Sequence, residues 1–142
     1  MGCMTMMGFR LGREGRLSRE TLAALDQSQA IIEFLPDGTI LRANQNFLSV
    51  MGYALGEIAG KHHRIFVDSA FVATAEYQAF WSQLASGQFS SGEFLRFGKD
   101  GRKVWILASY NPVYDKRGKI AKVVKIASDI SERKRVDEAV TG

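Results

Sequence analysis

The longest regular pattern of hydrophobic positions lies near the end of the chain. Lys103–Tyr114 is apolar at nearly every position on both faces, which is typical of a central strand covered on both sides. Asp115–Gly118 follows as a turn, in which Gly118 can take a positive φ. Lys119–Ala127 is rich in β-branched residues, and it predicts a second strand that returns beside the first.

A second, shorter hairpin is predicted nearer the N-terminus. Its strands are Gln29–Leu35 and Thr39–Arg42, joined by a turn at Pro36-Asp37-Gly38, where the fixed φ of proline suits the turn. A further strand, Ser91–Phe97, leads through a turn at Lys99–Arg102 into the first long strand. Antiparallel hairpins are therefore expected at both ends of the domain.

The middle of the chain has a helical rather than a strand pattern. Apolar positions predict short helices over residues 47–51 and 55–59, and one long helix from Asp68 or Ser69 to about Ser86. Hairpins at each end with helices between them indicate an α+β fold, with the helices on one face of the sheet.

The N-terminal segment is expected to be only partly structured. Residues 1–16 are rich in Met and Gly and predict a flexible leader, whereas residues 17–28 predict a short amphipathic helix on which Leu22 and Leu25 share a face. Arginine recurs at every third position in this region, but glycines interrupt the pattern, so we expect no nucleic-acid partner. Residues 29–130 then form the domain, and residues 131–142 begin an output helix.

The composition limits the function classes. A chain of 142 residues, 46% hydrophobic and 24% charged, suits one globular domain. No apolar run approaches the ~18–20 residues that span a bilayer, and the start is not a signal peptide. The single cysteine, Cys3, suits a reducing compartment, so we expect a cytoplasmic location. No hydrolase or Walker A motif is present, so we expect that the protein is not an enzyme.

A set of short motifs points to one family. The motifs are Trp81, Gly92–Arg96, Lys99–Arg102, Trp105-Ile106, Ser109–Pro112, Lys122–Lys125 and Asp129–Ser131. Together they resemble the PAS domain of bacterial chemoreceptors (methyl-accepting chemotaxis proteins) and aerotaxis transducers, over roughly Leu22 to Lys134. The resemblance implies a five-stranded antiparallel sheet with short helices and one long helix on one face, plus an N-terminal helix.

The same resemblance implies a sensory role. A PAS domain of this type senses a small ligand, oxygen or a redox state, and passes the signal through its C-terminal helix to a downstream signalling domain of the same polypeptide. Its N-terminal helix often packs across the sheet or pairs with a second subunit, and a homodimer is expected. The alternative is a ligand-free PAS module that serves only dimerisation or protein interaction.

His62 and His63 are the only histidines of the chain. Adjacent side chains in an extended connector point to opposite sides, so at most one easily faces a pocket. In haem-binding PAS domains of chemoreceptors the axial histidine often lies in this region, so the resemblance implies His62 or His63 as the ligand of haem b. The alternative is that both are half-exposed and cap or hydrogen-bond the connector.

Asn44, Tyr77 and Trp81 are the candidate contacts of a flavin. In flavin-binding PAS domains of aerotaxis receptors, an Asn at the start of the first short helix and aromatic residues of the long helix line the pocket, which implies FAD. That group's signature has a Trp and an Asn where this chain has Ser90 and Arg96. The alternative is that Tyr77 and Trp81 pack in the core and Asn44 caps a helix, with no cofactor bound.

Asp129-Ile130-Ser131-Glu132 follows the pattern of a capping box. Asp129 would accept a hydrogen bond from the amide of Glu132, and Glu132 would reach back to the amide of Asp129. The resemblance implies that this Asp links the sheet to the outgoing helix. Asp129 and Glu132 are therefore the predicted signal-output residues.

Overall fold

The computed structural model describes residues 11–141, and the side chains of residues 19–137. Its centre is one antiparallel sheet of five strands in the order β2-β1-β5-β4-β3. The strands are β1 (Ala30–Phe34), β2 (Ile40–Ala43), β3 (Ser90–Phe97), β4 (Lys103–Tyr114) and β5 (Ile120–Asp129). The predicted α+β fold with a five-stranded antiparallel sheet is confirmed.

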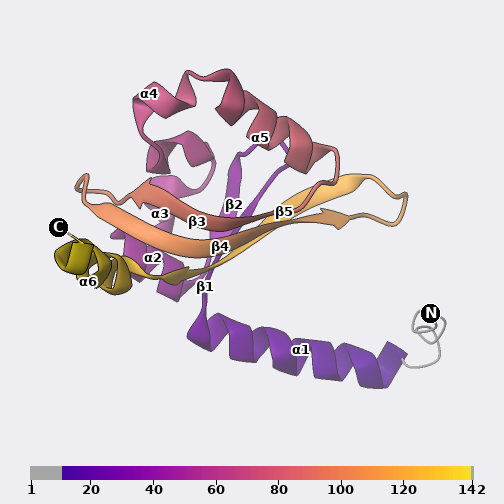
Figure 1. Cartoon of the computed structure of the whole chain (residues 1–142). Helices are drawn as coiled ribbons and strands as arrows, with labels where there is room; N and C mark the ends of the chain where they lie inside the picture. Colours follow the sequence, from indigo (N-terminus) through magenta and orange to yellow (C-terminus); the bar gives the residue numbers. More distant parts are fainter. Residues whose placement is uncertain (1–10, 142) are drawn as a thin grey trace.

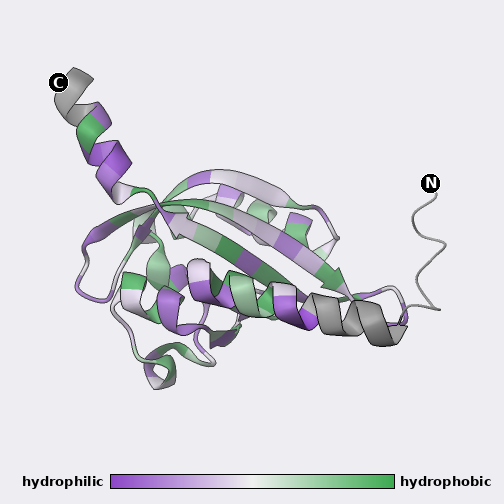
Figure 2. Cartoon of the chain, turned by 90° about the horizontal axis from the view of Figure 1, so that it is seen from below, coloured by the Kyte–Doolittle hydropathy of each residue, from purple (hydrophilic) through white to green (hydrophobic). Residues whose placement is uncertain are grey.

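The helices lie on both sides of this sheet. They are α1 (Leu11–Ser28), α2 (Gln45–Met51), α3 (Leu55–Ile58), the 3-10 helix η3 (His63–Phe66), α4 (Ser69–Val72), α5 (Ala75–Ala85) and α6 (Ser131–Thr141). α4 and α5 lie over one face, and α1 lies on the opposite side (Figure 1). Seen from that opposite side, α1 runs roughly along the long strands and α6 leads away from them (Figure 2). Within residues 11–141, no helix is long and apolar enough to cross a membrane.

Alternation along the strands directs one face of the sheet into the core. On β4, for example, Val104, Ile106, Ala108 and Tyr110 are buried, and the residues between them are more exposed. Buried aromatic side chains of the helices, among them Phe47, Phe66, Tyr77 and Trp81, fill the space above this face. The helices are thus held on the sheet by a core that is largely aromatic.

The prediction that Lys103–Tyr114 is a central strand is confirmed, because β4 lies between β5 and β3. The prediction that it is covered on both faces is wrong, because Leu107 on its outer face is 47% exposed. Trp105, another residue on this outer face, contacts the start of α6.

The single long helix predicted from Asp68 to Ser86 is also wrong. It is divided into α4 and α5, and Asp68 makes no side-chain capping bond. The hydroxyl of Thr74 donates to the carbonyl of Phe71 at 2.7 Å and accepts from the amide of Tyr77 at 3.2 Å. These local bonds end one helix and begin the next, so they override the helical spacing of the apolar residues.

The N-terminal helix begins earlier than predicted. α1 starts at Leu11 rather than residue 17, so residues 11–16 of the predicted leader are helical. The rest of that predicted leader, residues 1–10, lies outside the described residues.

The predicted capping box at Asp129 and Glu132 is not formed. The carboxylate of Asp129 accepts from the amide of Ser131 at 2.9 Å, and Glu132 pairs with Arg135. The reason is that β5 extends to Asp129, which pairs with Ile106 of β4 and therefore keeps an extended backbone. The helix begins only after it, at Ser131.

Candidate functional site

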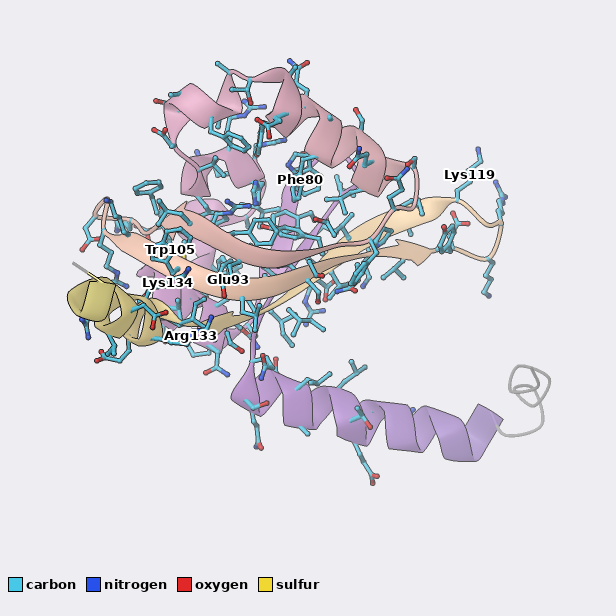
Figure 3. The ribbon with its side chains drawn as sticks, viewed as in Figure 1. Phe80, Glu93, Trp105, Lys119, Arg133 and Lys134 are labelled. Carbon is cyan, nitrogen blue, oxygen red and sulfur yellow. The ribbon has the colours of Figure 1, made fainter. Side chains whose placement is uncertain are left out.

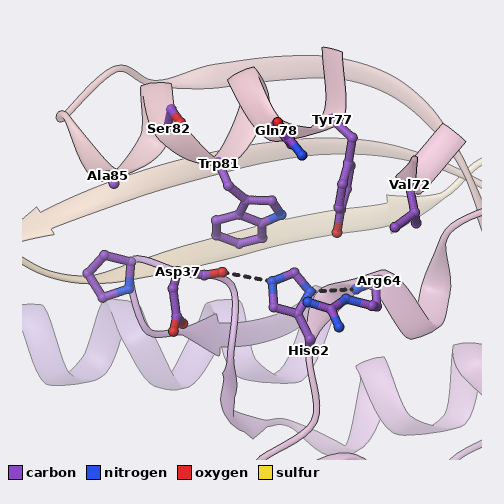
Figure 4. A pocket seen from close by; sticks show the side chains of 10 residues that line it. Asp37, His62, Arg64, Val72, Tyr77, Gln78, Trp81, Ser82 and Ala85 are labelled. Carbon is purple, nitrogen blue, oxygen red and sulfur yellow. Dashed lines mark hydrogen bonds between the residues drawn. The ribbon is translucent and has the colours of Figure 1, made fainter. Parts of the chain in front are cut away.

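A cleft of about 630 Å³ opens between α5, the β1–β2 turn and the connector before η3 (Figure 4). Its walls include Asp37 of the turn, His62 and Arg64 of the connector, and Tyr77 and Trp81 of α5. The turn is fastened to the connector by a hydrogen bond from the amide of His63 to the carbonyl of Gly38, at 2.9 Å. Gly38 has a φ of +98°, and a Cβ there would lie 2.5 Å from Nε2 of His62, so the close approach requires glycine.

His62 lines the cleft with both ring nitrogens occupied. Nδ1 accepts from the amide of Arg64 at 3.0 Å, and Nε2 lies 2.7 Å from the carbonyl oxygen of Asp37. Because a carbonyl only accepts, Nε2 carries the proton. The side chain of His62 therefore caps η3, which agrees with the loop-capping alternative for this residue.

His63 points the opposite way, into the core. It is fully buried, with Nδ1 2.7 Å from the hydroxyl of Tyr77 and Nε2 3.1 Å from the hydroxyl of Tyr110. The rings of Phe34 and Trp81 stand edge-on to it, with centroids 5.4 and 5.3 Å away. Burial, and then the positive charges of Arg96 and Lys125, lower the pKa of His63 well below its ordinary value, so the ring is neutral.

The hydrogen bonds around His63 form a chain in which the donor of each bond can be assigned. A guanidinium nitrogen of Arg96 donates to the hydroxyl oxygen of Tyr110 at 3.0 Å, so the proton of Tyr110 is free to go to Nε2 of His63. The one proton of the neutral ring is then on Nδ1 and is donated to the oxygen of Tyr77. The hydroxyl proton of Tyr77 remains available on the side of the cleft. Burial raises the pKa of Tyr77 to about 12, so it stays protonated.

Trp81 supplies a second donor to the cleft. Its side chain is 7% exposed, and Nε1 forms no hydrogen bond of good geometry with the described residues, although it lies close enough to the hydroxyl of Tyr77 to lower the pKa of that group slightly against the larger effect of burial. A buried indole N–H normally donates a hydrogen bond, because leaving that bond unmade costs about 1–3 kcal/mol. Tyr77 and Trp81 together thus offer two donors to the acceptor atoms of a ligand in this cleft.

Asn44 lies away from these residues. Its oxygen accepts from the amides of Phe47 at 2.9 Å and Ile31 at 3.0 Å, and its nitrogen donates to the carbonyl of Gln29 at 2.9 Å. The side chain is the N-cap of α2 and ties this helix to the end of α1, where it also donates to Asp26. Of the predicted site residues, the structure brings His62, His63, Tyr77 and Trp81 together and leaves Asn44 elsewhere.

The start of α6 is held by residues that the sequence did not single out for this role. The carboxylate of Glu93 on β3 pairs with Arg133 at 2.6 Å and with Lys134 at 2.7 Å. Nζ of Lys134 also lies 4.7 Å from the ring centroid of Trp105. Figure 3 shows these four side chains where α6 meets the sheet, with Phe80 on the opposite face. The hydrogen bond and charge of Lys134, with the charge of Arg133, lower the pKa of Glu93.

Comparison with known proteins decides the family. The sequence model of the PAS fold matches residues 25–135. The chain belongs to the PAS family.

Two relatives match most of this chain. It is 49% identical over 109 residues to the biofilm dispersion protein BdlA of Pseudomonas aeruginosa, a match that covers 77% of this chain and 26% of that protein. It is 26% identical over 120 residues to the oxygen sensor protein DosP of Escherichia coli, covering 84% of this chain and 15% of DosP. The chain therefore spans about a quarter or less of either relative.

A solved structure agrees with the fold. A light-oxygen-voltage domain, studied with a flavin analogue, superposes with a TM-score of 0.67 at 23% identity, covering 86% of this chain and 93% of that one. This likeness concerns the fold alone.

The residues named for haem and flavin are only in part placed to hold those cofactors: Tyr77 and Trp81 line the cleft, whereas the histidine nitrogens and Asn44 are engaged with other groups. An axial ligand needs a free imidazole nitrogen, and both nitrogens of His62 and of His63 are within hydrogen-bond distance of other groups. The amide of Asn44 is used on backbone atoms, away from Tyr77 and Trp81. Among the side chains of residues 19–137, no group of three or more His, Cys, Asp or Glu could hold a metal ion.

The neutral His63 makes the stability of this PAS domain depend on pH. Its folded pKa is lower than the ordinary 6.5, so below that pH the unfolded chain binds a proton that the folded chain does not. The free energy of unfolding should therefore fall as the pH falls, by up to ~1.4 kcal/mol per pH unit. Urea unfolding between about pH 7 and pH 5.5 measures this slope.

His63→Gln is the comparison for that slope, because it removes only this titration. Over the same range the wild type should lose about 1 kcal/mol more than the variant. Equal slopes in the two proteins would show that His63 is not held neutral.

Proposed function

We propose that this PAS domain is a cytoplasmic, non-enzymatic sensory module of a chemotaxis-type signal transducer. It binds a small ligand in the cleft beside Tyr77 and Trp81, and it passes the signal through α6 to a downstream domain of the same polypeptide. The identity with BdlA supports the signalling role, and the similarity to an oxygen sensor supports sensing. The observation that carries the proposal is the pair of buried donors at the cleft, Nε1 of Trp81 and the hydroxyl of Tyr77.

The hydrogen-bond chain gives the ligand a connection to the output helix. From Tyr77 it runs through His63 and Tyr110 to Arg96 on the inner face of β3. Glu93, which holds α6, lies on the outer face of the same strand, three residues before Arg96. Because β3 is an edge strand, held by β4 alone, a shift at its inner face also moves Glu93.

The second candidate function is dimerisation through α1. Leu22 on this helix is 60% exposed, and a hollow of about 670 Å³ separates α1 from the outer face of β1 and β5. Apolar residues of both elements, including Leu25, Ile31 and Val124, line this hollow. A second α1 would cover them, so the homodimer remains part of the proposal, and the ligand-free module remains its alternative.

Native mass spectrometry of the purified full chain tests the ligand. We expect a mass above that of the polypeptide, and a small molecule that is released on denaturation. Trp81→Phe keeps the aromatic packing but removes the N–H, so ligand affinity should fall about tenfold. Tyr114→Phe, which removes a donor from an exposed side chain outside the cleft, is the matched control and should retain the ligand.

The mass spectrum and the absorbance spectrum of the same preparation also distinguish a ligand-binding module from a ligand-free one and from a haem or flavin protein. A bare polypeptide mass, in protein expressed with haem and flavin precursors, would leave the dimerisation module as the function. A Soret band or absorbance at about 450 nm would instead show that haem or flavin binds despite the geometry described above. A chain that begins at Gln27 lacks α1 and should be monomeric if α1 forms the dimer.

Loosening α6 should be possible without unfolding the domain. Glu93→Gln removes the charge that holds Arg133 and Lys134, so amide hydrogen exchange in residues 131–141 should become several-fold faster. The global unfolding transition should hardly change, because exposed ion pairs contribute little to stability.

Glu57→Gln is the control for that measurement, since it removes another surface ion pair, with Lys99, away from α6. It should leave the exchange of α6 unchanged. Equal exchange in wild type and Glu93→Gln would remove Glu93 from the signalling path.

A further inference from the structure

Two cations are buried in the core of the domain. Arg96 is 6% exposed and Lys125 is 1% exposed. Among the side chains of residues 19–137, no carboxylate forms an ion pair with either of them. A buried charge without a counter-ion costs stability, and here each cation lies over an aromatic ring instead, Arg96 over Phe94 and Lys125 over Tyr110.

Arg96 lines a second groove, which adjoins the cleft at Tyr77 but does not include His62 or Trp81. The groove has a volume of about 530 Å³, within the range of small-molecule sites, and lies between α5 and the edge strand β3. Aromatic side chains make up much of its wall: Phe71, Tyr77, Phe80, Phe94 and Trp105. An apolar groove with one buried cation in its wall has the composition of a site for an amphipathic anion.

Some N–H groups of the Arg96 guanidinium make no hydrogen bond with the described residues. Of its five N–H groups, the structure uses one on the carbonyl of Leu95 and one on the hydroxyl of Tyr110, both at 3.0 Å. Nε is buried and has no partner among the described residues. Nε and a neighbouring Nη form the edge at which arginine binds a carboxylate through two parallel hydrogen bonds.

The electrostatic potential around the guanidinium of Arg96 is positive. Burial alone would raise the pKa of Tyr110, but the charges of Arg96 and Lys125 outweigh burial and lower it. Nζ of Lys125 lies 5.0 Å from the centroid of the Tyr110 ring, on the core side.

The acidic side chains of the groove oppose this potential only in part. Glu76 and Glu93 both line it. Glu93 is already paired with the cations of α6, Arg133 and Lys134. Glu76 is exposed to solvent, which weakens its repulsion of an anion at the buried Arg96.

We propose that this groove binds a small organic carboxylate, which pairs with Arg96 through its charge and packs its apolar body against Phe80 and Phe94. Lys125 does not line the groove; it adds positive charge from the core side. This site goes beyond the ligand of the cleft, and it is placed on the strand that also holds α6.

The test compares carboxylates with their uncharged amides on the full-length chain at neutral pH. Isothermal titration calorimetry is run with butyrate, decanoate and phenylacetate, each beside the corresponding carboxamide. We expect at least one carboxylate to bind about tenfold tighter than its amide, because the charge-assisted bonds to Arg96 are lost in the amide. If no carboxylate binds more tightly than its amide, the assignment is wrong, whether or not the cleft holds a ligand.

Two variants locate the charge that matters. Arg96→Met should remove the preference for the carboxylate. Arg64→Met, which removes an exposed arginine from the wall of the other cleft, should retain it. The reverse result would place the carboxylate in the cleft and overturn the groove as its site.

Stability and NMR separate ligand binding from a structural role. Because Arg96 and Lys125 are buried without a counter-ion, Lys125→Met and Arg96→Met should each melt at a higher temperature than the wild type. In the wild type, the Nε–H resonance of Arg96 should shift when the carboxylate is added, a measurement that does not depend on the folding of any variant. An unshifted resonance at saturation would contradict the proposal.

Discussion

Two positive charges buried beside one tyrosine hydroxyl set the conditions for the rest of the core. Arg96 and Lys125 reach Tyr110 from neighbouring strands of the sheet, and neither has an ionic partner among the side chains described. Since a guanidinium can only donate, the oxygen of Tyr110 must accept. With Arg96 donating, the hydroxyl proton of Tyr110 points toward Nε2 of His63, and this assigns the proton of His63 to Nδ1, next to Tyr77.

The function follows from where this chain of bonds begins and ends. One end is the hydroxyl of Tyr77 in the wall of a cleft, beside the unpaired N–H of Trp81. The other end is β3, the edge strand whose outer face holds α6 through Glu93. A ligand that draws on the donors of the cleft changes the same hydrogen bonds that position the edge strand. In the proposed function, the cleft and α6 are therefore connected through side chains of the core and of β3.

Local patterns in the sequence were enough for the strands, since the predicted bounds of β4 agree with the structure and the opposite orientations of His62 and His63 are found. The division of the long helix at Thr74 was missed, because a hydroxyl bonded to the backbone leaves no trace in hydrophobic spacing. Lys125 could have been recognised: alternation along β5 places it on the same face as Val123 and Ala127, both buried. The partners of His63, by contrast, are 14 and 47 residues away and depend on the completed fold.

The proton of His63 gives the most direct test of this account. Nitrogen NMR of the imidazole in the full chain, near neutral pH, distinguishes the two neutral tautomers from the charged ring. The account predicts a neutral ring with its proton on Nδ1, because Tyr110 donates to Nε2. A proton on Nε2 or a charged imidazolium would contradict it, since Tyr110 would then not be oriented by the buried cations.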